Sequence, residues 1–555
     1  MVRHSIRRRE APSRSGPTPY LRRTRMFRIT IVHRFLRFAA CGLVLGAVGN
    51  AQSPDVIVFD VGVDFGNTND IHYWGQSGGI AAYNIATQSC NIGNAQLDWF
   101  DAGGDTRHPV ISQNMFRLKD GRFEHIGQSW LKHGFCAVNE FEIGCSPCGS
   151  TSCDTLGIGC ADTYWATLND GAGGRSKRFV NATTGVHSDS TPAPTGPTVI
   201  RGRLQVAVAD IDPAQNNGAE YFIEGHYITA DDAAAGNDFN NASWRRVNVV
   251  SVSNVNGGGS THRQEPGIYA WQDQDPLVDI IQVTNTESGT STLYLVGCRV
   301  TLIGSNTWAY EYAIQNLSSD QSANSFRVPY GNGTTISNIG FHDVDYHSGD
   351  PYALTDWTPI DTGNTVLWDT ASFGSDPNAN AIRWGTLYNF RFEANAQPTT
   401  GTATIGLFKP GTNSTLSVPG LQVPDEPGAM CGTASSVATR NGGSNPSGYT
   451  ASAPVPGLSV SFGVFGFYNL GVVIAYNGPA NLVLGNGQAL LFDPTSAPLF
   501  SLNLTGLPIG QASTTVPNDI ALCGATAYTQ AVLVGPTGAG PPFQLYNSQD
   551  LTVGF

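Results

Sequence analysis

The stretch CRVTLIGSNTWAYEYAI, residues 298–314, indicates the fold of this chain more clearly than any other. Apolar side chains occupy every second position from Cys298 to Leu302 and again from Trp308 to Ile314, with the turn-forming sequence GSN between them. Alternation with a period of two is typical of antiparallel strands that bury one face. The stretch therefore predicts a β-hairpin.

The same alternation returns from Trp384 to Phe392. Several such strands separated by turns predict a β-sandwich over residues 291–420. Residues 52–290 are predicted to be an irregular, Cys-rich region with two or three short strands, which either stands alone or completes the same sandwich. A linker at residues 421–430, rich in Pro and Gly, then leads to a small C-terminal β-sandwich at residues 431–555.

Composition supports a mainly β fold. The chain has 65 Gly and 32 Pro, and only 13% of its residues are charged, whereas long helices need Ala, Leu, Glu and Lys. The best helix start is Thr229, which precedes the sequence ADDAAA and would cap a short helix that ends at Gly236.

The first 51 residues describe a secretory signal peptide. They carry eleven Arg and a single acidic residue, and an apolar run from Phe38 to Val48 precedes a small-residue cleavage site at Ala51. That run is shorter than the roughly 20 residues that span a bilayer, so we expect no transmembrane anchor after cleavage. Met26 is an alternative start. The chain after Ala51 has 19 basic and 42 acidic residues, and this acidity argues against a nucleic-acid partner.

Nine Cys follow residue 51, which in an exported protein predicts disulfide bonds. Cys431 and Cys523 are predicted to pair and to close the C-terminal region. The odd count leaves one thiol free or in an intermolecular bond. Irregular spacing within the N-terminal cluster favours a disulfide-stapled loop over a zinc knuckle or a thioredoxin-like site; the cluster consists of Cys136, Cys145, Cys148, Cys153 and Cys160.

The C-terminal region has almost no charge. Its charged side chains are Arg440, Asp493, Asp519 and Asp550, and it contains no His. The sequences VPNDIALCGATAYTQAVLV (516–534) and FQLYNS (543–548) resemble the low-charge β domain that closes many large secreted planctomycete-type bacterial proteins of unknown function. The sequences IGQSWLKHGF (126–135) and IGFH (339–342) are similar to such proteins too. The resemblance implies no activity and no catalytic residues.

Asp343, Asp345 and His347 are the sharpest candidates for metal ligands. On a strand they would share one face, where two carboxylates and an imidazole can chelate a divalent cation. Glu224 and His226, again two apart, are a second segment that can supply ligands. Calcium or another divalent metal is the predicted ion. The alternative interpretation is a polar outer face of half-buried strands.

Histidine and tryptophan residues form two further groups of candidate functional residues. His108, His125 and His133 lie close in sequence and can supply acid–base chemistry, or they are ordinary structural histidines. Exposed Trp side chains can stack on sugars, although core Trp is commoner; the candidates are Trp74, Trp99, Trp271 and Trp308. The chain has no GxSxG, HExxH or Walker sequence.

The leading hypothesis is a secreted or cell-surface protein with a structural, attachment or binding role and no catalytic activity. Its expected partners are cell-surface or matrix components or glycans. The first alternative is a metal-dependent extracellular enzyme centred on Asp343, Asp345 and His347. The second alternative is a glycan-binding protein.

Overall fold

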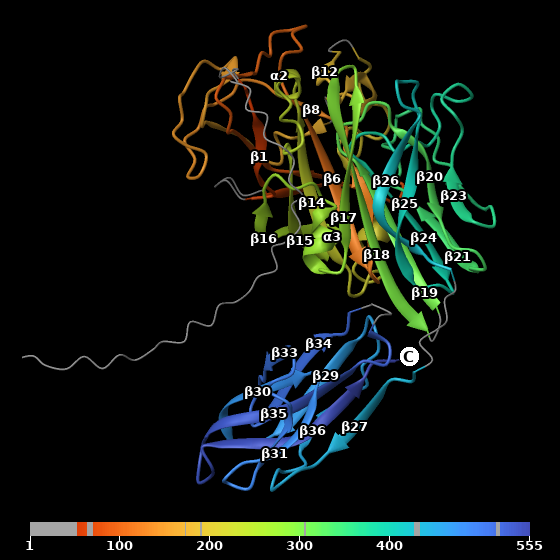
Figure 1. Cartoon of the computed structure of the whole chain (residues 1–555). Helices are drawn as coiled ribbons and strands as arrows, with labels where there is room; N and C mark the ends of the chain where they lie inside the picture. The colour runs from red at the N-terminus through yellow and green to blue at the C-terminus, as the bar shows by residue number, and fades with distance from the viewer. Residues whose placement is uncertain are drawn as a thin grey trace, which may run out of the picture. The chain divides into compact units, whose positions relative to one another are not determined.

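Strands dominate the computed structural model of this chain, which has 52% strand and 4% helix (Figure 1). It describes residues 53–63, 70–171, 174–188, 191–304, 307–426, 433–517 and 522–554. The mainly β prediction is confirmed. The predicted signal peptide lies outside the described residues. No helix among those residues is long and apolar enough to cross a membrane.

The predicted sandwich consists of two five-stranded antiparallel sheets. The first, which we call the central sheet, has the order β17 (Asp279–Glu287), β18 (Thr290–Gly304), β19 (Thr307–Asn316), β24 (Thr386–Ala394) and β21 (Ile336–His342). The second, the outer sheet, has the order β22 (Thr358–Asp361), β23 (Thr365–Asp369), β20 (Ala323–Pro329), β25 (Pro398–Leu407) and β26 (Thr415–Pro424).

The predicted hairpin is formed by β18 and β19. Leu302 pairs with Trp308 and Cys298 pairs with Tyr312. The inward-facing aromatic residues of β19 and β24 fill the core between the central and outer sheets, as the period-two pattern predicted. Residues 305 and 306 of the predicted turn lie outside the described residues.

The N-terminal region contains more regular structure than its sequence suggested. Its main sheet has nine strands, and we call it the nine-stranded sheet: in order it consists of β16 (Asn254–His262), β15 (Ala242–Ser251), β14 (Glu220–Ile228), β6 (Val110–Lys119), β7 (Arg122–Gln128), β13 (Leu204–Ala207), β3 (Ile80–Ile85) and β2 (Ile71–Ser77), with β8 (Lys132–His133) paired to β6. Many of its buried positions hold Gly, Asn, Gln or Ser, so the usual apolar alternation is missing from the sequence.

Smaller elements complete this region. A three-stranded sheet consists of β1 (Val56–Val61), β4 (Thr87–Asn91) and β10 (Ala161–Tyr164). Two short strand pairs are β5 (Leu97–Asp98) with β9 (Thr155–Leu156), and β11 (Val180–Asn181) with β12 (Val186–His187). The helices are α1 (Val208–Ile211), α2 (Ala230–Ala235), α3 (Tyr269–Gln274) and the 3-10 turn η2 (Lys177–Phe179). The predicted helix is α2, which follows Thr229 and ends at Gly236 with φ +78°. The predicted side-chain cap is wrong: the Thr229 hydroxyl donates to the Asp231 carboxylate at 2.6 Å and does not bond to the helix backbone.

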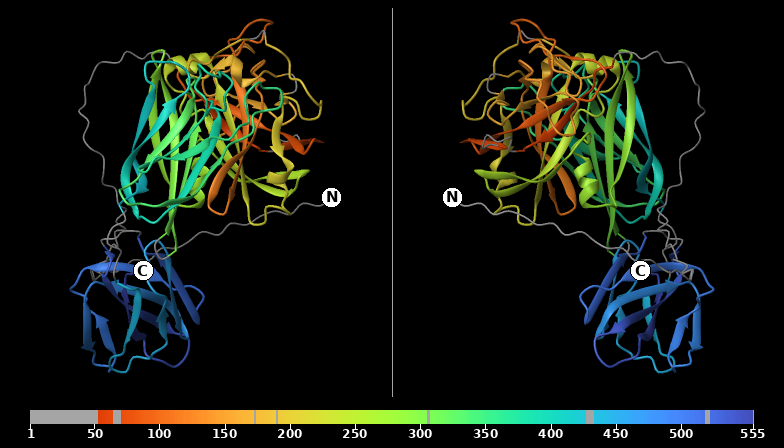
Figure 2. Two further views of the ribbon diagram at one scale, coloured as in Figure 1. Left: turned by 90° about the vertical axis from the view of Figure 1, so that its right-hand side faces the viewer. Right: turned by 90° about the vertical axis from the view of Figure 1, so that its left-hand side faces the viewer.

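The central sheet is buried on both faces. One face packs on the outer sheet, and the other packs on the nine-stranded sheet through a core that joins Phe116, Phe222 and Trp244 to Leu295 and Leu387. A third core lies between the nine-stranded and three-stranded sheets. Residues 53–426 therefore form a stack of sheets with three apolar layers (Figures 1 and 2).

The C-terminal region is a separate set of antiparallel strands with its own core. That core includes Tyr449, Phe462 and Leu533. Its five-stranded sheet has the order β27 (Ser436–Arg440), β36 (Phe543–Thr552), β35 (Thr526–Pro536), β30 (Tyr468–Tyr476) and β33 (Pro498–Asn503). The smaller sheets consist of β28 (Tyr449–Ala451), β29 (Ser459–Phe465) and β34 (Ile509–Thr515), and of β31 (Pro479–Val483) and β32 (Ala489–Phe492).

Disulfides staple the N-terminal Cys cluster. The bonds are Cys90–Cys145, Cys136–Cys153 and Cys148–Cys160. The predicted loop is confirmed, and Cys90, which lies on β4, anchors it to the three-stranded sheet. Cys523 is disulfide-bonded as well, while its predicted partner Cys431 lies outside the described residues. Cys298 is a buried free thiol.

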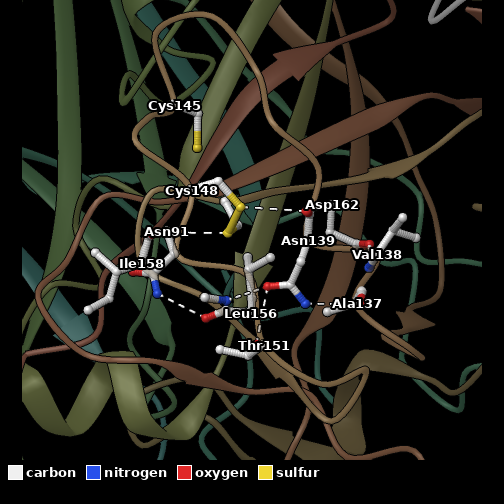
Figure 3. The surroundings of a disulfide bond; sticks show 12 residues. Asn91, Ala137, Val138, Asn139, Cys145, Cys148, Thr151, Leu156, Ile158 and Asp162 are labelled. Carbon is white, nitrogen blue, oxygen red and sulfur yellow. Dashed lines mark hydrogen bonds between the residues drawn. A yellow bond between two sulfur atoms is a disulfide. The ribbon is translucent and has the colours of Figure 1, made fainter.

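The stapled loop is organised around one side chain, Asn139. Its amide donates to the backbone carbonyls of Ala137 and Thr155, and its oxygen accepts from the backbone N–H of Gly157. Figure 3 shows Asn139 beside the Cys148 disulfide, with Asp162 nearby. Asp162 is buried and accepts a hydrogen bond from the Val138 backbone at 2.7 Å.

We predict that thiol reactivity depends on unfolding. The native protein is expected to show no thiol reactive with a disulfide reagent, because burial raises the pKa of Cys298 and hides its sulfur. Denatured without reductant, the chain cleaved after Ala51, which lacks Cys41, is expected to show one, that of Cys298. Replacing Cys431 with Ala should expose one additional thiol, that of Cys523; an unchanged thiol count in this variant would contradict the predicted Cys431–Cys523 pair.

We also predict that Asp162 makes stability depend on pH. Burial is the main cause that raises the pKa of Asp162 to about 7, so between its ordinary value and pH 7 the folded state binds more protons than the unfolded state. Its contribution to the free energy of unfolding therefore falls as pH rises through that window, by at most about 1.4 kcal/mol per pH unit. Urea denaturation from pH 4 to 7 should show that Asp162→Asn gains stability relative to wild type as pH rises. The control Asp101→Asn, at an exposed position, should keep a constant difference from wild type.

Candidate metal centre

The predicted ligands Asp343, Asp345 and His347 do not lie on a strand, because β21 ends at His342. Asp343 accepts a hydrogen bond from Asn380, and burial raises its pKa to about 7. Asp343 and Asp345 line a cavity of about 320 Å³ together with Asp210 and His125. His347 packs against the ring of Trp130 instead, with centroids 5.0 Å apart. The alternation that would have placed the three side chains on one face is absent.

Glu224 and His226 lie in the interior of the nine-stranded sheet. The Glu224 carboxylate accepts hydrogen bonds from the Asn114 amide at 2.6 Å, the Gly267 backbone N–H at 2.6 Å and the Gln315 amide at 2.8 Å. Three donors satisfy this carboxylate without a cation. His226 is fully buried and meets the edge of the Trp384 ring.

Three other histidines do converge. Among the residues that the structure describes, one group of three or more potential ligands has its ligand atoms within 4.8 Å of one another: His108, His133 and His187. We call this group the His cluster. Its ring centroids are 4.8 to 5.2 Å apart. His108 and His187 are buried, and His133 is half-buried.

Strand pairing brings these histidines together. His133 belongs to β8, which pairs with the first residues of β6 so that His133 lies opposite Val110, two residues after His108. His187 ends the short hairpin of β11 and β12, where it pairs with Val180. Val110 and Val180 share a small apolar core that includes Trp384, and this packing places the hairpin beside β8 (Figure 1).

Backbone carbonyls determine the tautomers of two of the rings. His108 Nδ1 lies 2.7 Å from the Phe100 carbonyl oxygen, and His187 Nε2 lies 3.1 Å from the His108 carbonyl oxygen. Because a carbonyl oxygen only accepts, both of these nitrogens carry protons. The lone pairs are therefore on His108 Nε2 and His187 Nδ1. A backbone carbonyl that holds the non-ligating nitrogen is a usual feature of histidines that bind metals.

His133 completes the cluster. Its Nδ1 lies 2.9 Å from His108 Nε2 and donates to it, since His108 has its lone pair there. Its Nε2 is buried and has no hydrogen-bond partner among the described residues. Burial, followed by the neighbouring His187 and His108, lowers the pKa of His133 to about 3. His133 is consequently neutral at physiological pH, which is the form that binds a metal.

The remaining candidates from the sequence are His125 and four Trp residues, and their side chains contact other parts of the protein. His125 is buried, donates from Nε2 to the Gly127 carbonyl and accepts at Nδ1 from the Leu387 backbone. Trp99, Trp271 and Trp308 are core residues. The Trp74 ring is covered by the Arg203 guanidinium at 3.7 Å. The three core rings present no open face for a sugar, whereas Trp74 is half-buried and has Arg203 over one face.

The sequence singled out His108 and His133 but missed His187. No motif surrounds His187, and 54 residues separate it from His133. Comparisons with known proteins add no candidate: no protein-family model matches this chain, and no curated protein matches it.

Proposed function

We propose that this chain is an exported protein that binds a Zn²⁺ or Cu²⁺ ion through His108, His133 and His187. The observation that carries the proposal is the convergence of three imidazoles within 4.8 Å. Imidazole nitrogens favour Zn²⁺ and Cu²⁺, whereas Ca²⁺ and Mg²⁺ require oxygen ligands. The donor set of the His cluster therefore favours Zn²⁺ or Cu²⁺ at this position, while Ca²⁺ at the acidic segments stays a prediction.

The spacing of the nitrogens supports a shared ion. Two nitrogens bound at about 2.0–2.1 Å to a tetrahedral ion lie roughly 3.3 Å apart, and His108 Nε2 and His133 Nδ1 are 2.9 Å apart. Binding through both of these nitrogens requires His133 to change tautomer, so that its proton moves from Nδ1 to Nε2, and requires the two rings to shift apart by roughly 0.4 Å, with loss of the hydrogen bond between them. Three protein ligands leave one position open, as in zinc sites that bind water or substrate.

The charges near the cluster constrain the fourth ligand. Arg175 and Lys132 both contribute to lowering the pKa of His133, so positive charge lies close to the proposed ion. Such charge favours neutral imidazoles and opposes a bare cation. A hydroxide or another anion in the fourth position would offset this repulsion.

We expect the chain, stripped of metal by a chelator, to bind one Zn²⁺ or Cu²⁺ per molecule. His187→Gln and His133→Gln should each weaken binding by at least about 100-fold, more than the loss typical of an outer-shell partner. Isothermal titration calorimetry measures the affinity, and elemental analysis measures the stoichiometry. Thermal unfolding of each variant verifies that it is folded.

Two control variants distinguish binding at the His cluster from binding at another histidine or at the acidic segment 343–347. His262→Gln removes an imidazole outside the His cluster and should leave the affinity unchanged. Asp345→Asn tests the acidic segment predicted from sequence and should likewise have no effect. Loss of binding in Asp345→Asn with full binding in His187→Gln would contradict the His cluster and favour the segment at 343–347.

Export and attachment form a second proposal, supported by the leader, the disulfides and the C-terminal surface. Ten of the 22 large hydrophobic side chains that are most exposed among the described residues lie between Leu458 and Val534. Phe465 and Phe467 are 54% and 62% exposed and contact each other, and Phe465 pairs with exposed Ile509. Exposed apolar groups of this kind mark interaction surfaces. We propose that they attach the protein to an apolar component of the cell surface or matrix.

Replacing both Phe465 and Phe467 with Ser in the full chain should shift the protein from the cell fraction to the medium, because the apolar contact is lost. The matched control replaces Leu277 and Ile303, which are each 51% exposed, with Ser. Immunoblots of the two fractions report the change. Equal retention of the double Phe variant and wild type would contradict attachment through this surface.

A further inference from the structure

A cavity of about 140 Å³ lies apart from the His cluster, and basic side chains line it. The walls come from η2, from the end of β7 at Gln128, and from the segments around Asp350 and Arg383. Four of the 19 Lys and Arg residues that follow residue 51 line this one cavity; they are Lys177, Arg178, Arg383 and Lys409. Such a concentration stands out in a chain that is otherwise strongly acidic.

The acidic residues of the cavity do not cancel this charge. Asp320 forms an ion pair with Lys409 at 2.8 Å, which neutralises those two. Asp350 accepts hydrogen bonds from Ser176 and from the Trp130 indole. Three basic residues, Lys177, Arg178 and Arg383, therefore face one remaining carboxylate.

Arg383 is the strongest indication of a ligand. Arg383 is only 8% exposed, and its Nη2 donates to the backbone carbonyls of Pro377 and Ala379. Nε is buried without a hydrogen-bond partner, and no ion pair among the described residues includes Arg383. The guanidinium lies 3.6 Å from the Tyr352 ring centroid. A buried guanidinium keeps its charge, and a buried charge without an ionic partner is costly.

Lys177, like Arg383, is a buried basic residue without an ion pair among the described residues. Its ammonium group lies 3.2 Å from the Gln128 amide oxygen and 3.4 Å from that of Asn114, and these neutral acceptors are its closest side-chain partners among the described residues. Burial lowers its pKa to about 7, while Glu224 and Asp350 act in the opposite direction. An anion in the cavity would supply the missing charge for both Lys177 and Arg383.

We propose that this cavity binds a small organic carboxylate, with Arg383 and Lys177 as its buried anchors and exposed Arg178 as a third, weaker contact. Guanidinium groups match the planar carboxylate through parallel hydrogen bonds. Tyr346, Tyr352 and Phe373 line the same cavity and provide apolar contact for the organic part of the ligand. None of the three histidines of the His cluster lines the cavity, so the two proposals rest on different side chains, although Val180 of the cavity wall pairs with His187.

The test is titration of the full chain with acetate and benzoate, and with sulfate at matched ionic strength, by isothermal titration calorimetry. We expect saturable binding of a carboxylate that exceeds the binding of sulfate. Arg383→Gln and Lys177→Met should each weaken it roughly tenfold or more, because a charged hydrogen bond is lost. Arg178→Gln, at an exposed position, should fold normally and weaken binding by a smaller factor.

The matched control is Arg327→Gln, which removes an exposed positive charge that does not line the cavity and should leave binding unchanged. Absence of saturable carboxylate binding to wild type would overturn the proposal. Equal affinity of wild type and Arg178→Gln, together with equal affinity of any folded variant at Arg383 or Lys177, would overturn it as well. Sulfate that binds as tightly as the carboxylates would overturn the assignment of the ligand class.

Discussion

The fold of residues 53–426 depends on the burial of the central sheet on both faces. A sheet covered on one side only would need a polar second face, but here Leu295 and Leu387 pack against Phe116 and Trp244 of the nine-stranded sheet. The Glu224 carboxylate reinforces this contact, since it receives hydrogen bonds from Asn114 on β6 and Gln315 on β19. A buried carboxylate with three donors holds two sheets at one spacing, because separating them would leave those groups unpaired.

This constraint also positions the polar groups from which function is inferred. The His cluster forms at the end of β6, where β8 returns and the hairpin of β11 and β12 packs through Val180 and Trp384. Lys177 and Arg178 of η2 and Val180 of β11, which belong to the same segment, line the basic cavity. A short stretch, residues 176–187, thus contributes to both candidate sites. Its conformation follows from packing against the sheets, because η2 and a hairpin with strands of only two residues have little stability of their own.

The disulfides perform a different task in the N-terminal region. Three bonds and Asn139 organise a segment whose strands are only two to four residues long. Such a segment buries little apolar surface, so cross-links that restrict its unfolded state contribute much of its stability. The C-terminal region has an apolar core around Phe462 and Leu533 in addition to the disulfide of Cys523.

Several features were determined by the sequence alone, because they depend on neighbours along the chain. The alternation from Trp308 to Ile314 specified the hairpin of β18 and β19, and the order of Thr229, two Asp and Gly236 specified α2. Tertiary structure decided the rest. The meeting of His187 with His108 depends on which strands pair, and local periodicity carries no information about contacts 79 residues apart. The same reason explains why the second buried face of the central sheet and the isolated charge of Arg383 emerged only when the sheets were stacked.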